Sequence, residues 1–218
     1  MKTAKRFAML AGLALALMAV LSFAGCSKKG GSAKAAPESD FVFKLSDDGT
    51  FIAITNYKGD AKNLVIPETI QGVPVEVIDG FYQNKKIKSV VIPSSAKVIN
   101  NSAFLYCESL EKVTLPEGLL CIDQEAFSKT ALTSVTLPKS LLYIGLGAFE
   151  SDNLSEINIP DDAAFIGTNE YADLSRSFDG SKIDSSVELQ KKLNGIKQKY
   201  TWKEDFYKEH EELYKYLN

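Results

Sequence analysis

The chain has 218 residues, of which 45% are hydrophobic and 24% are charged, and its formal net charge is −3. This composition is typical of a folded domain with a sizeable core, and it argues against disorder over most of the chain. Residues 1–26 hold three basic side chains and no acidic one, which leaves 22 basic groups (25 less 3) against 28 acidic ones. A net-acidic domain offers no electrostatic footprint for nucleic acid, so we expect no nucleic-acid partner.

The amino terminus is typical of an export signal, with the basic start MKTAKR, an apolar run from Phe7 to Val20 and small residues before Cys26. The run is too short for a permanent transmembrane helix. The sequence FAGC resembles the lipobox of bacterial lipoproteins, although Phe23 stands where Leu is usual. The resemblance implies a signal peptide over residues 1–25 and a diacylglycerol anchor on Cys26. The protein would then be exported and attached to a bacterial membrane, at the cell surface or the outer membrane. The alternative is an ordinary secretory signal with an incidental cysteine.

Residues 26–40 read CSKKGGSAKAAPESD, a composition that cannot form a core and that predicts a flexible tether. The segments FVFKL and FIAIT then alternate in polarity on either side of Asp47-Asp48-Gly49. This pattern predicts a β-hairpin, which we expect to form an amino-terminal lid. The paired carboxylates could instead suggest calcium, but they lack the spaced oxygens of an EF-hand loop, and we expect no metal.

A short phrase ending in proline recurs every 22 to 26 residues. LVIP, VVIP, VTLP, VTLP and INIP end at Pro67, Pro93, Pro116, Pro138 and Pro160. Aliphatic residues stand six, three and one positions before each of the last four prolines. An isoleucine stands six residues after each of these four prolines. In the coils of Pro93, Pro116 and Pro138, an Ala-Phe pair begins four residues after that isoleucine. This period predicts stacked coils that share one core, with Phe81, Phe104, Phe127 and Phe149 forming an aromatic column.

The segments LEKVTLPEGLLCIDQEAF and LTSVTLPKSLLYIGLGAF resemble the BspA-like leucine-rich repeats of bacterial surface proteins. The resemblance covers residues 41–180. It implies a right-handed solenoid of about five coils, with short parallel strands and 3₁₀ or irregular connections. The chain departs from the pattern at the insertion GTNEYADLSRS after Ile166 and at QGVPV in the first coil.

The sequence offers few residues that could form a catalytic site. The resemblance places Cys107 as a small inward side chain, whereas Cys121 precedes the inward Ile122 and should point outward. Opposite directions argue against a disulfide between them. His210 is the only histidine, so a Cys–His or Ser–His pair has one possible base, and no glycine-rich phosphate loop is present. We therefore expect neither an enzyme nor a cofactor.

Residues 181–218 change to a helical period. Two capping boxes each precede an apolar stripe, the first with Leu189, Leu193, Ile196 and Tyr200 and the second with Phe206, His210, Leu213 and Leu217. We expect a carboxy-terminal helical cap on the last coil. The alternative is a docking helix for a partner, suggested by Trp202, Tyr207 and Tyr214.

One outward column of the repeat is apolar where a solvated strand would be polar. Its members are Val98, Cys121, Tyr143 and Phe165, preceded by Val77 in the first coil. We expect an exposed stripe and a candidate partner site. The alternatives are that an insertion or a neighbouring loop covers the stripe, or that the local direction of the side chains is reversed. The other outward face is a mixed polar surface that indicates no particular ligand.

These features predict a membrane-anchored, non-catalytic interaction module of the cell surface or envelope. The BspA-like resemblance implies protein binding and an adhesin-like role toward host matrix or bacterial surface proteins. Two alternatives stay open: a structural envelope lipoprotein without a host partner, and an accessory subunit of an envelope enzyme.

Overall fold

The computed structural model describes residues 34–151, 153–159, 164–165 and 211. The chain divides into two compact units, Met1–Ser32 and Ala33–Asn218, and every described residue belongs to the second unit. The predictions for the signal peptide, for Cys26 and for the insertion after Ile166 therefore fall outside the described residues. The predicted helical cap also does, apart from Glu211, which is helical and exposed.

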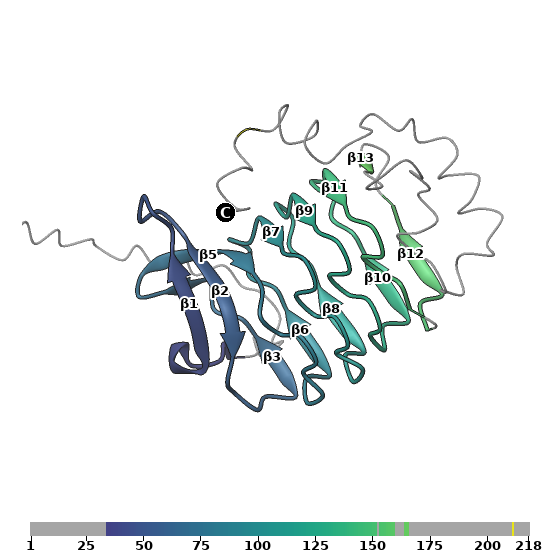
Figure 1. Cartoon of the computed structure of the whole chain (residues 1–218), viewed down its shortest axis with the longest axis horizontal. Helices are drawn as coiled ribbons and strands as arrows, with labels where there is room; N and C mark the ends of the chain where they lie inside the picture. Colours follow the sequence, from purple (N-terminus) through teal and green to yellow (C-terminus); the bar gives the residue numbers. More distant parts are fainter. Residues whose placement is uncertain (1–33, 152, 160–163, 166–210, 212–218) are drawn as a thin grey trace, which may run out of the picture. The chain divides into compact units, whose positions relative to one another are not determined.

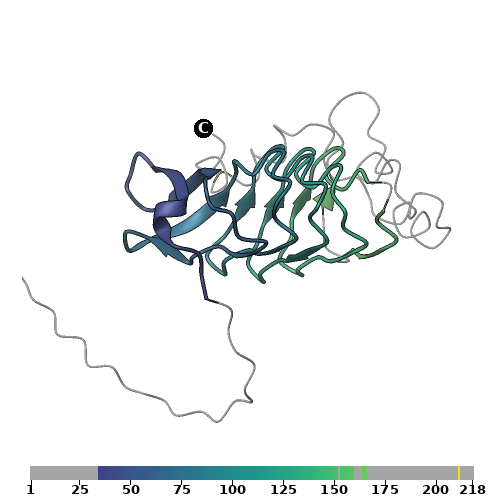
Figure 2. The same cartoon turned by 90° about the horizontal axis from the view of Figure 1, so that it is seen from below.

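The described residues form a β-solenoid of about five coils, and each coil contributes one strand before its proline and one after it (Figures 1 and 2). The pre-proline strands are β3 (Asn63–Val65), β6 (Ser89–Val91), β8 (Lys112–Thr114), β10 (Ser134–Thr136) and β12 (Glu156–Asn158). The post-proline strands are β5 (Val73–Ile78), β7 (Val98–Ile99), β9 (Cys121–Ile122), β11 (Tyr143–Ile144) and β13 (Ala164–Phe165). A short strand β4 (Thr69–Ile70) pairs with β5 in antiparallel fashion.

Parallel pairing brings equivalent residues of successive coils side by side. The post-proline strands form one continuous sheet, in the order β5-β7-β9-β11-β13. Its register joins Ile78 to Ile99, Ile99 to Ile122 and Ile122 to Ile144. The pre-proline strands form a three-stranded sheet, β3-β6-β8, and a separate pair, β10-β12. The repeat seen in the sequence is therefore also the repeat of the backbone.

An antiparallel hairpin of β1 (Phe41–Leu45) and β2 (Ile52–Tyr57) precedes the coils, behind a 3₁₀ turn η1 (Glu38–Asp40). The Asp48 carboxylate closes the turn by accepting hydrogen bonds from the Thr50 amide at 3.0 Å and the Ser46 hydroxyl at 2.7 Å. Gly49 has a positive φ of 74° there. Strand β2 pairs in parallel with β5, so the hairpin continues the post-proline sheet. Its role as a lid stays a prediction.

The main core lies between the two sets of strands and contains the predicted inward columns. The inward isoleucines are fully buried, and the rings of Phe81, Phe104, Phe127 and Phe149 are stacked. Ring centroids are 4.7, 5.2 and 5.5 Å apart along this column. The predicted ladder of apolar side chains through the coils is confirmed.

The connection around each core phenylalanine is a run of hydrogen-bonded turns. The amides of Phe81, Phe104 and Phe127 donate to alanine carbonyls of the next coil at 2.8 to 2.9 Å. Left-handed backbone recurs two residues after the phenylalanine, with φ of 58° at Gln83, 59° at Tyr106 and 55° at Lys129. Because the main chain is bonded from coil to coil here as well, these turns form a third ladder beside the two strand ladders.

Candidate functional site

The predicted partner stripe is not exposed. Val98 and Cys121 are each 1% exposed and Tyr143 is 0% exposed, so the expectation of an open apolar surface is wrong. Their direction is as predicted, because they belong to a hydrophobic cluster separate from the main core. We call this the second-face cluster; its buried members are Phe51, Val77, Val98, Cys121 and Tyr143.

Tyr143 shows why the expected partner anchor is a structural residue. Its hydroxyl donates to Asp123 Oδ1 at 3.3 Å, and the same carboxylate oxygen accepts the Gln124 amide at 2.7 Å. Asp123 is itself buried, and the partly buried Leu120 and Leu142 pack against the cluster. A tyrosine that is buried and hydrogen-bonded within its own chain is not available to bind another protein.

Phe165 does not continue the stripe. In the register of β11 and β13, Tyr143 lies beside Ala164, and Phe165 lies beside the inward Ile144. Phe165 is the fifth residue after Pro160, whereas Ile144 is the sixth residue after Pro138. The expected alignment of Phe165 with Tyr143 is therefore wrong, because the backbone register pairs Phe165 with Ile144.

The two described cysteines lie in different clusters, and no disulfide joins them. The Cys107 thiol is fully buried and donates to the Phe81 carbonyl at 3.0 Å. Burial raises the pKa of Cys107 to about 11, so it is a thiol and not a thiolate nucleophile at neutral pH. Within the described ranges, no cluster of three or more His, Cys, Asp or Glu side chains could hold a metal ion. Nor does the described part of the chain contain a helix that is long and apolar enough to cross a membrane.

An exposed aromatic pair lies on the turns of the first two coils. Tyr82 is 53% exposed and Tyr106 is 39% exposed, and their rings meet edge to face with centroids 6.2 Å apart. They follow the core residues Phe81 and Phe104, each in a turn that sends the phenylalanine inward. Only two other large hydrophobic side chains in the described residues are this exposed, Leu45 and Val91. The pair is therefore one of the few places in the described residues where large hydrophobic side chains are exposed.

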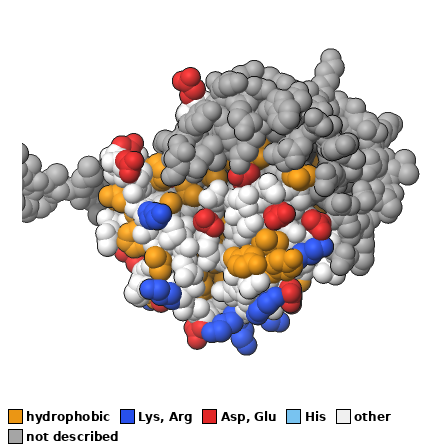
Figure 3. All heavy atoms as spheres, viewed as in Figure 1, with side chains coloured by type: hydrophobic (Ala, Val, Ile, Leu, Met, Phe, Trp, Pro, Cys, Tyr) orange, Lys and Arg blue, Asp and Glu red, His pale blue; other side chains and the backbone are white. Residues whose placement is uncertain are grey.

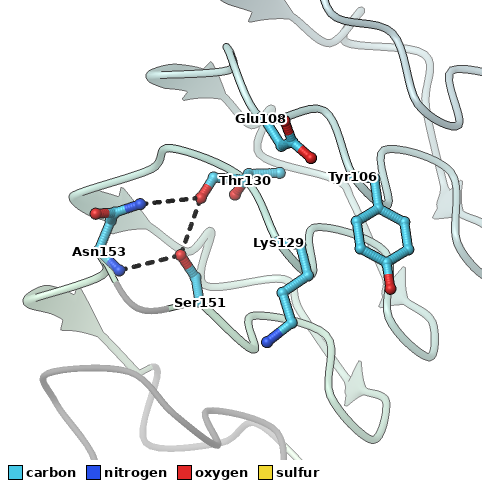
Figure 4. A pocket seen from close by; sticks show the side chains of 6 residues that line it. All are labelled: Tyr106, Glu108, Lys129, Thr130, Ser151 and Asn153. Carbon is cyan, nitrogen blue, oxygen red and sulfur yellow. Dashed lines mark hydrogen bonds between the residues drawn. The ribbon is translucent and has the colours of Figure 1, made fainter.

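A small polar pocket adjoins the pair (Figure 4). It has a volume of about 240 Å³ and is lined by residues of three successive turns: Tyr106, Glu108, Lys129, Thr130, Ser151 and Asn153. The Thr130 carbonyl accepts the Ser151 hydroxyl at 3.0 Å and the Asn153 side-chain amide at 3.5 Å. These bonds join two coils, and they give the pocket an ordered wall.

Ion pairs between neighbouring coils flank the pair and the pocket. Lys85 Nζ is 2.6 Å from Glu108 Oε1, and Lys129 Nζ is 2.8 Å from Glu150 Oε1. Acidic and basic side chains are also interspersed over the described surface shown in Figure 3. The local field is thus mixed in sign, which suits a polar protein surface better than a strongly charged polymer.

The sequence contains a signal for this site that the repeat columns do not include. Tyr82 and Tyr106 stand one and two residues after the repeated phenylalanine, where the next coil has Ser128 and Lys129. Aromatic residues in two successive turns mark a surface that the repeat itself does not require. Their proximity could not be read from the columns, because they occupy different positions of the repeat.

The fold is that of a leucine-rich-repeat solenoid, and comparisons with known proteins agree. Residues 75–200 match six copies of the BspA type leucine rich repeat region, and the chain belongs to this family.

Two solved structures are similar in sequence as well as in fold. A leucine-rich repeat protein of T. pallidum is 33% identical, with a TM-score of 0.60 over 66% of this chain and 69% of that one. A leucine-rich repeat protein from Bacteroides capillosus is 30% identical, with a TM-score of 0.50 over 54% of this chain and 92% of that one.

A third similarity is one of fold alone. The pneumococcal vaccine antigen PcpA is 21% identical, with a TM-score of 0.50 over 71% of this chain and 49% of that one. A search of curated protein sequences finds no match.

Proposed function

We propose that this protein is a non-catalytic protein-interaction module held at a bacterial membrane. The partner surface consists of the Tyr82 and Tyr106 pair, the adjoining pocket and the flanking ion pairs. The observation that carries the proposal is the edge-to-face contact of two exposed tyrosines on a mixed polar surface. Membership of a repeat family built around extended surfaces supports the same class of function.

The chemistry of the pair suits protein association. Tyrosine is enriched at interface hot spots because it brings a large contact area and a polar hydroxyl at low conformational cost. The contact with Tyr82 already restricts the Tyr106 ring, so less side-chain freedom is lost on binding. The pocket beside Tyr106 can accept one partner side chain, and Glu108 and Lys129 at its edge favour a polar or charged group there.

The proposed location rests on the amino-terminal sequence. Residues 1–25 would direct export, Cys26 would carry the lipid, and the tether would be shorter than the predicted residues 26–40. The Ala36 amide donates to the Val65 carbonyl at 2.9 Å and Glu38–Asp40 form η1, so the last part of the predicted tether is bound to the first coil. The hairpin β1–β2 would act as the lid of the first coil. A partner within reach of such a tether is a host matrix protein or another protein of the bacterial surface.

The partner surface is tested with the double variant Tyr82→Ala, Tyr106→Ala. The matched control is Leu45→Ala, Val91→Ala, which removes the two other large hydrophobic side chains that are exposed in the described part of the chain. Affinity is measured against purified collagen, fibronectin and laminin and against intact bacteria of the source strain. We expect the tyrosine variant to lose roughly tenfold or more in affinity, with an unchanged melting temperature, and the control to bind normally. Equal binding by both variants would reject the surface.

The location is tested separately. Mass spectrometry of the mature amino terminus should find an acylated Cys26, and Cys26→Ala should move the protein to the soluble fraction. Protease added to intact cells should remove a surface-displayed protein. A wild-type protein that stays in the envelope and binds none of these partners would favour the structural alternative.

A further inference from the structure

The burial of the second-face cluster requires a covering layer. A sheet has two faces, and side chains on a face with no second layer stay in contact with water. Here the face opposite the main core carries Val98, Cys121 and Tyr143, which are at most 1% exposed. The partly buried residues that pack on the cluster are Ala53, Leu120 and Leu142, and these lie in or directly before strands of the same sheet. Among the described elements, none forms a second layer over this face.

We propose that residues 201–218 form an amphipathic helix that covers the second-face cluster. This segment lies beyond the matched repeats, which end at residue 200. Thr201 and Glu204 form a capping box, and apolar or aromatic residues follow at helical spacing: Trp202, Phe206, His210, Leu213 and Leu217. The described residue Glu211 is helical and exposed, as a residue on the polar side of such a helix should be.

The length of the proposed helix is sufficient to cross the second-face cluster. Neighbouring strands are about 4.8 Å apart, so the cluster extends about 15 Å from β5 to β11. An 18-residue helix is about 27 Å long and can span all four strands. The described strands end with β13, whose Ala164 lies beside Tyr143 at the edge of this face. Residues 166–200, which the repeat match still includes, lie between β13 and this segment, and their length allows the chain to return across the face.

In this arrangement the apolar stripe has a structural role and not the partner-binding role that its sequence suggested. The aromatic residues of the carboxy-terminal segment would serve the fold and not a partner. The second-face cluster would then be closed to other proteins, which leaves the tyrosine pair as the accessible aromatic surface among residues 34–151. The two proposals rest on different residues, so one can fail without the other.

The two buried thiols provide an internal test in the full chain carrying Cys26→Ser. Cys121 lies in the second-face cluster and Cys107 lies in the main core. The test variant is Phe206→Asp, Leu213→Asp, and the control Lys208→Ala, Lys215→Ala changes the net charge by the same amount on the opposite side of the helix. Iodoacetamide labelling of each cysteine is followed by peptide mass spectrometry.

We expect Cys121 to react roughly tenfold faster or more in the test variant, because an uncovered face opens locally, while Cys107 stays protected. The control should label like the parent. Protection of Cys121 in the test variant with an intact fold would overturn the proposal. Two results with the parent chain would also overturn the proposal. Loss of Cys121 protection on dilution would identify a second copy of the chain as the cover. Loss of Cys121 protection on removal of residues 1–33 would identify the amino-terminal segment as the cover.

A second measurement applies if the aspartates unfold the repeats and expose Cys107 too. Phe206 is replaced by p-benzoylphenylalanine in the full chain, and the protein is irradiated. Crosslinks should map to the peptides that contain Val98, Cys121 or Tyr143. A mixture of isotopically light and heavy protein should give crosslinks within single chains. Crosslinks to the last coil alone, or between chains, would overturn the proposal.

Discussion

The two sets of strands share one core and differ in what their outer faces carry. Outward residues of the pre-proline strands include Lys112, Thr114 and Thr136, all of which are exposed. Outward residues of the post-proline sheet include Val98 and Tyr143, both of which are buried. The inner columns of the two sets are alike, so only the outer residues distinguish them. In a solenoid, the polarity of an outer column therefore indicates whether that face is covered.

The open face is stabilised by contacts that water tolerates. Ser89 donates to Asn63 Oδ1 at 2.8 Å across two coils, and Lys88 Nζ lies 3.6 Å from Glu111 Oε1. Such exposed pairs each contribute about 0 to 1 kcal/mol. The covered face buries aromatic and aliphatic side chains instead, and each of these contributes about 1.5 to 3 kcal/mol. Substitutions in the shared core and on each face test how far the two faces differ.

The largest effect is expected in the core that both sets of strands share. Phe127 is fully buried and stacks between Phe104 and Phe149. Phe127→Ala should lower the free energy of unfolding by about 3 to 5 kcal/mol, because it leaves a cavity and weakens two coil interfaces. Denaturant unfolding followed by circular dichroism measures the loss. A variant as stable as the parent would show that the aromatic column is not continuous.

The comparison of the two faces is tested by Tyr143→Ser and Thr136→Ser. Tyr143 is buried on the post-proline side, and its truncation should cost about 3 kcal/mol or more. Thr136 is exposed on the pre-proline side, and its change should stay within about 0.5 kcal/mol. Thermal unfolding of both variants decides the matter. Similar small losses would mean that the post-proline face is as open as the other.

The sequence predicts the inner columns well because the repeat constrains them several times over. An error at Ile122 would also displace Ile99 and Ile144, its neighbours in register. The outward direction of Cys121 follows from strand alternation and is likewise correct. The burial of that face could not be derived, because strand alternation gives the direction of a side chain and not what packs against it.

Two other features were not predicted from the sequence, and in both cases the reason is local. Phe165 lies one position away from its expected column because the connection after Pro160 is one residue shorter. Tyr82 and Tyr106 lie in turns, where no two-residue alternation applies and where the backbone at Tyr106 is left-handed. Columns fix the position of a strand residue, but the direction of a turn side chain depends on the turn's own dihedral angles.

A smaller effect is expected from the single hydrogen bond between Tyr143 and Asp123. Tyr143→Phe keeps the ring in the second-face cluster and removes only the hydroxyl, whose distance to Asp123 Oδ1 is 3.3 Å. The loss of stability should be about 1 kcal/mol, well below that of Tyr143→Ser. Chemical denaturation of the two variants side by side gives the difference. Equal losses would show that the hydroxyl, and not the ring, determines the stability of this face.

The smallest effect is expected at the corner where the chain turns from the pre-proline to the post-proline side. Glu68 accepts hydrogen bonds from the Ser94 amide at 3.0 Å, the Ser94 hydroxyl at 2.8 Å and the Ser95 amide at 3.0 Å. Partial burial alone would raise the pKa of Glu68, but these hydrogen bonds outweigh it and hold the pKa below the usual 4.5. The ionised carboxylate therefore links the first two coils at a point that both sets of strands share.

A depressed pKa in the folded state stabilises the protein above the unfolded pKa, and the stabilisation is lost as the pH falls through the folded value. Glu68→Gln should therefore lower the melting temperature at pH 7, and the difference from the parent should shrink below about pH 4.5. Because Glu68 is largely exposed, we expect only about 0.5 kcal/mol at pH 7 after solvent screening. Ser94→Ala removes one donor and should reduce the pH dependence without abolishing it. The melting temperatures of Glu68→Gln and the parent could instead differ by the same amount at pH 7 and pH 3. That result would show that this corner depends on the shape of the Glu68 side chain and not on its charge.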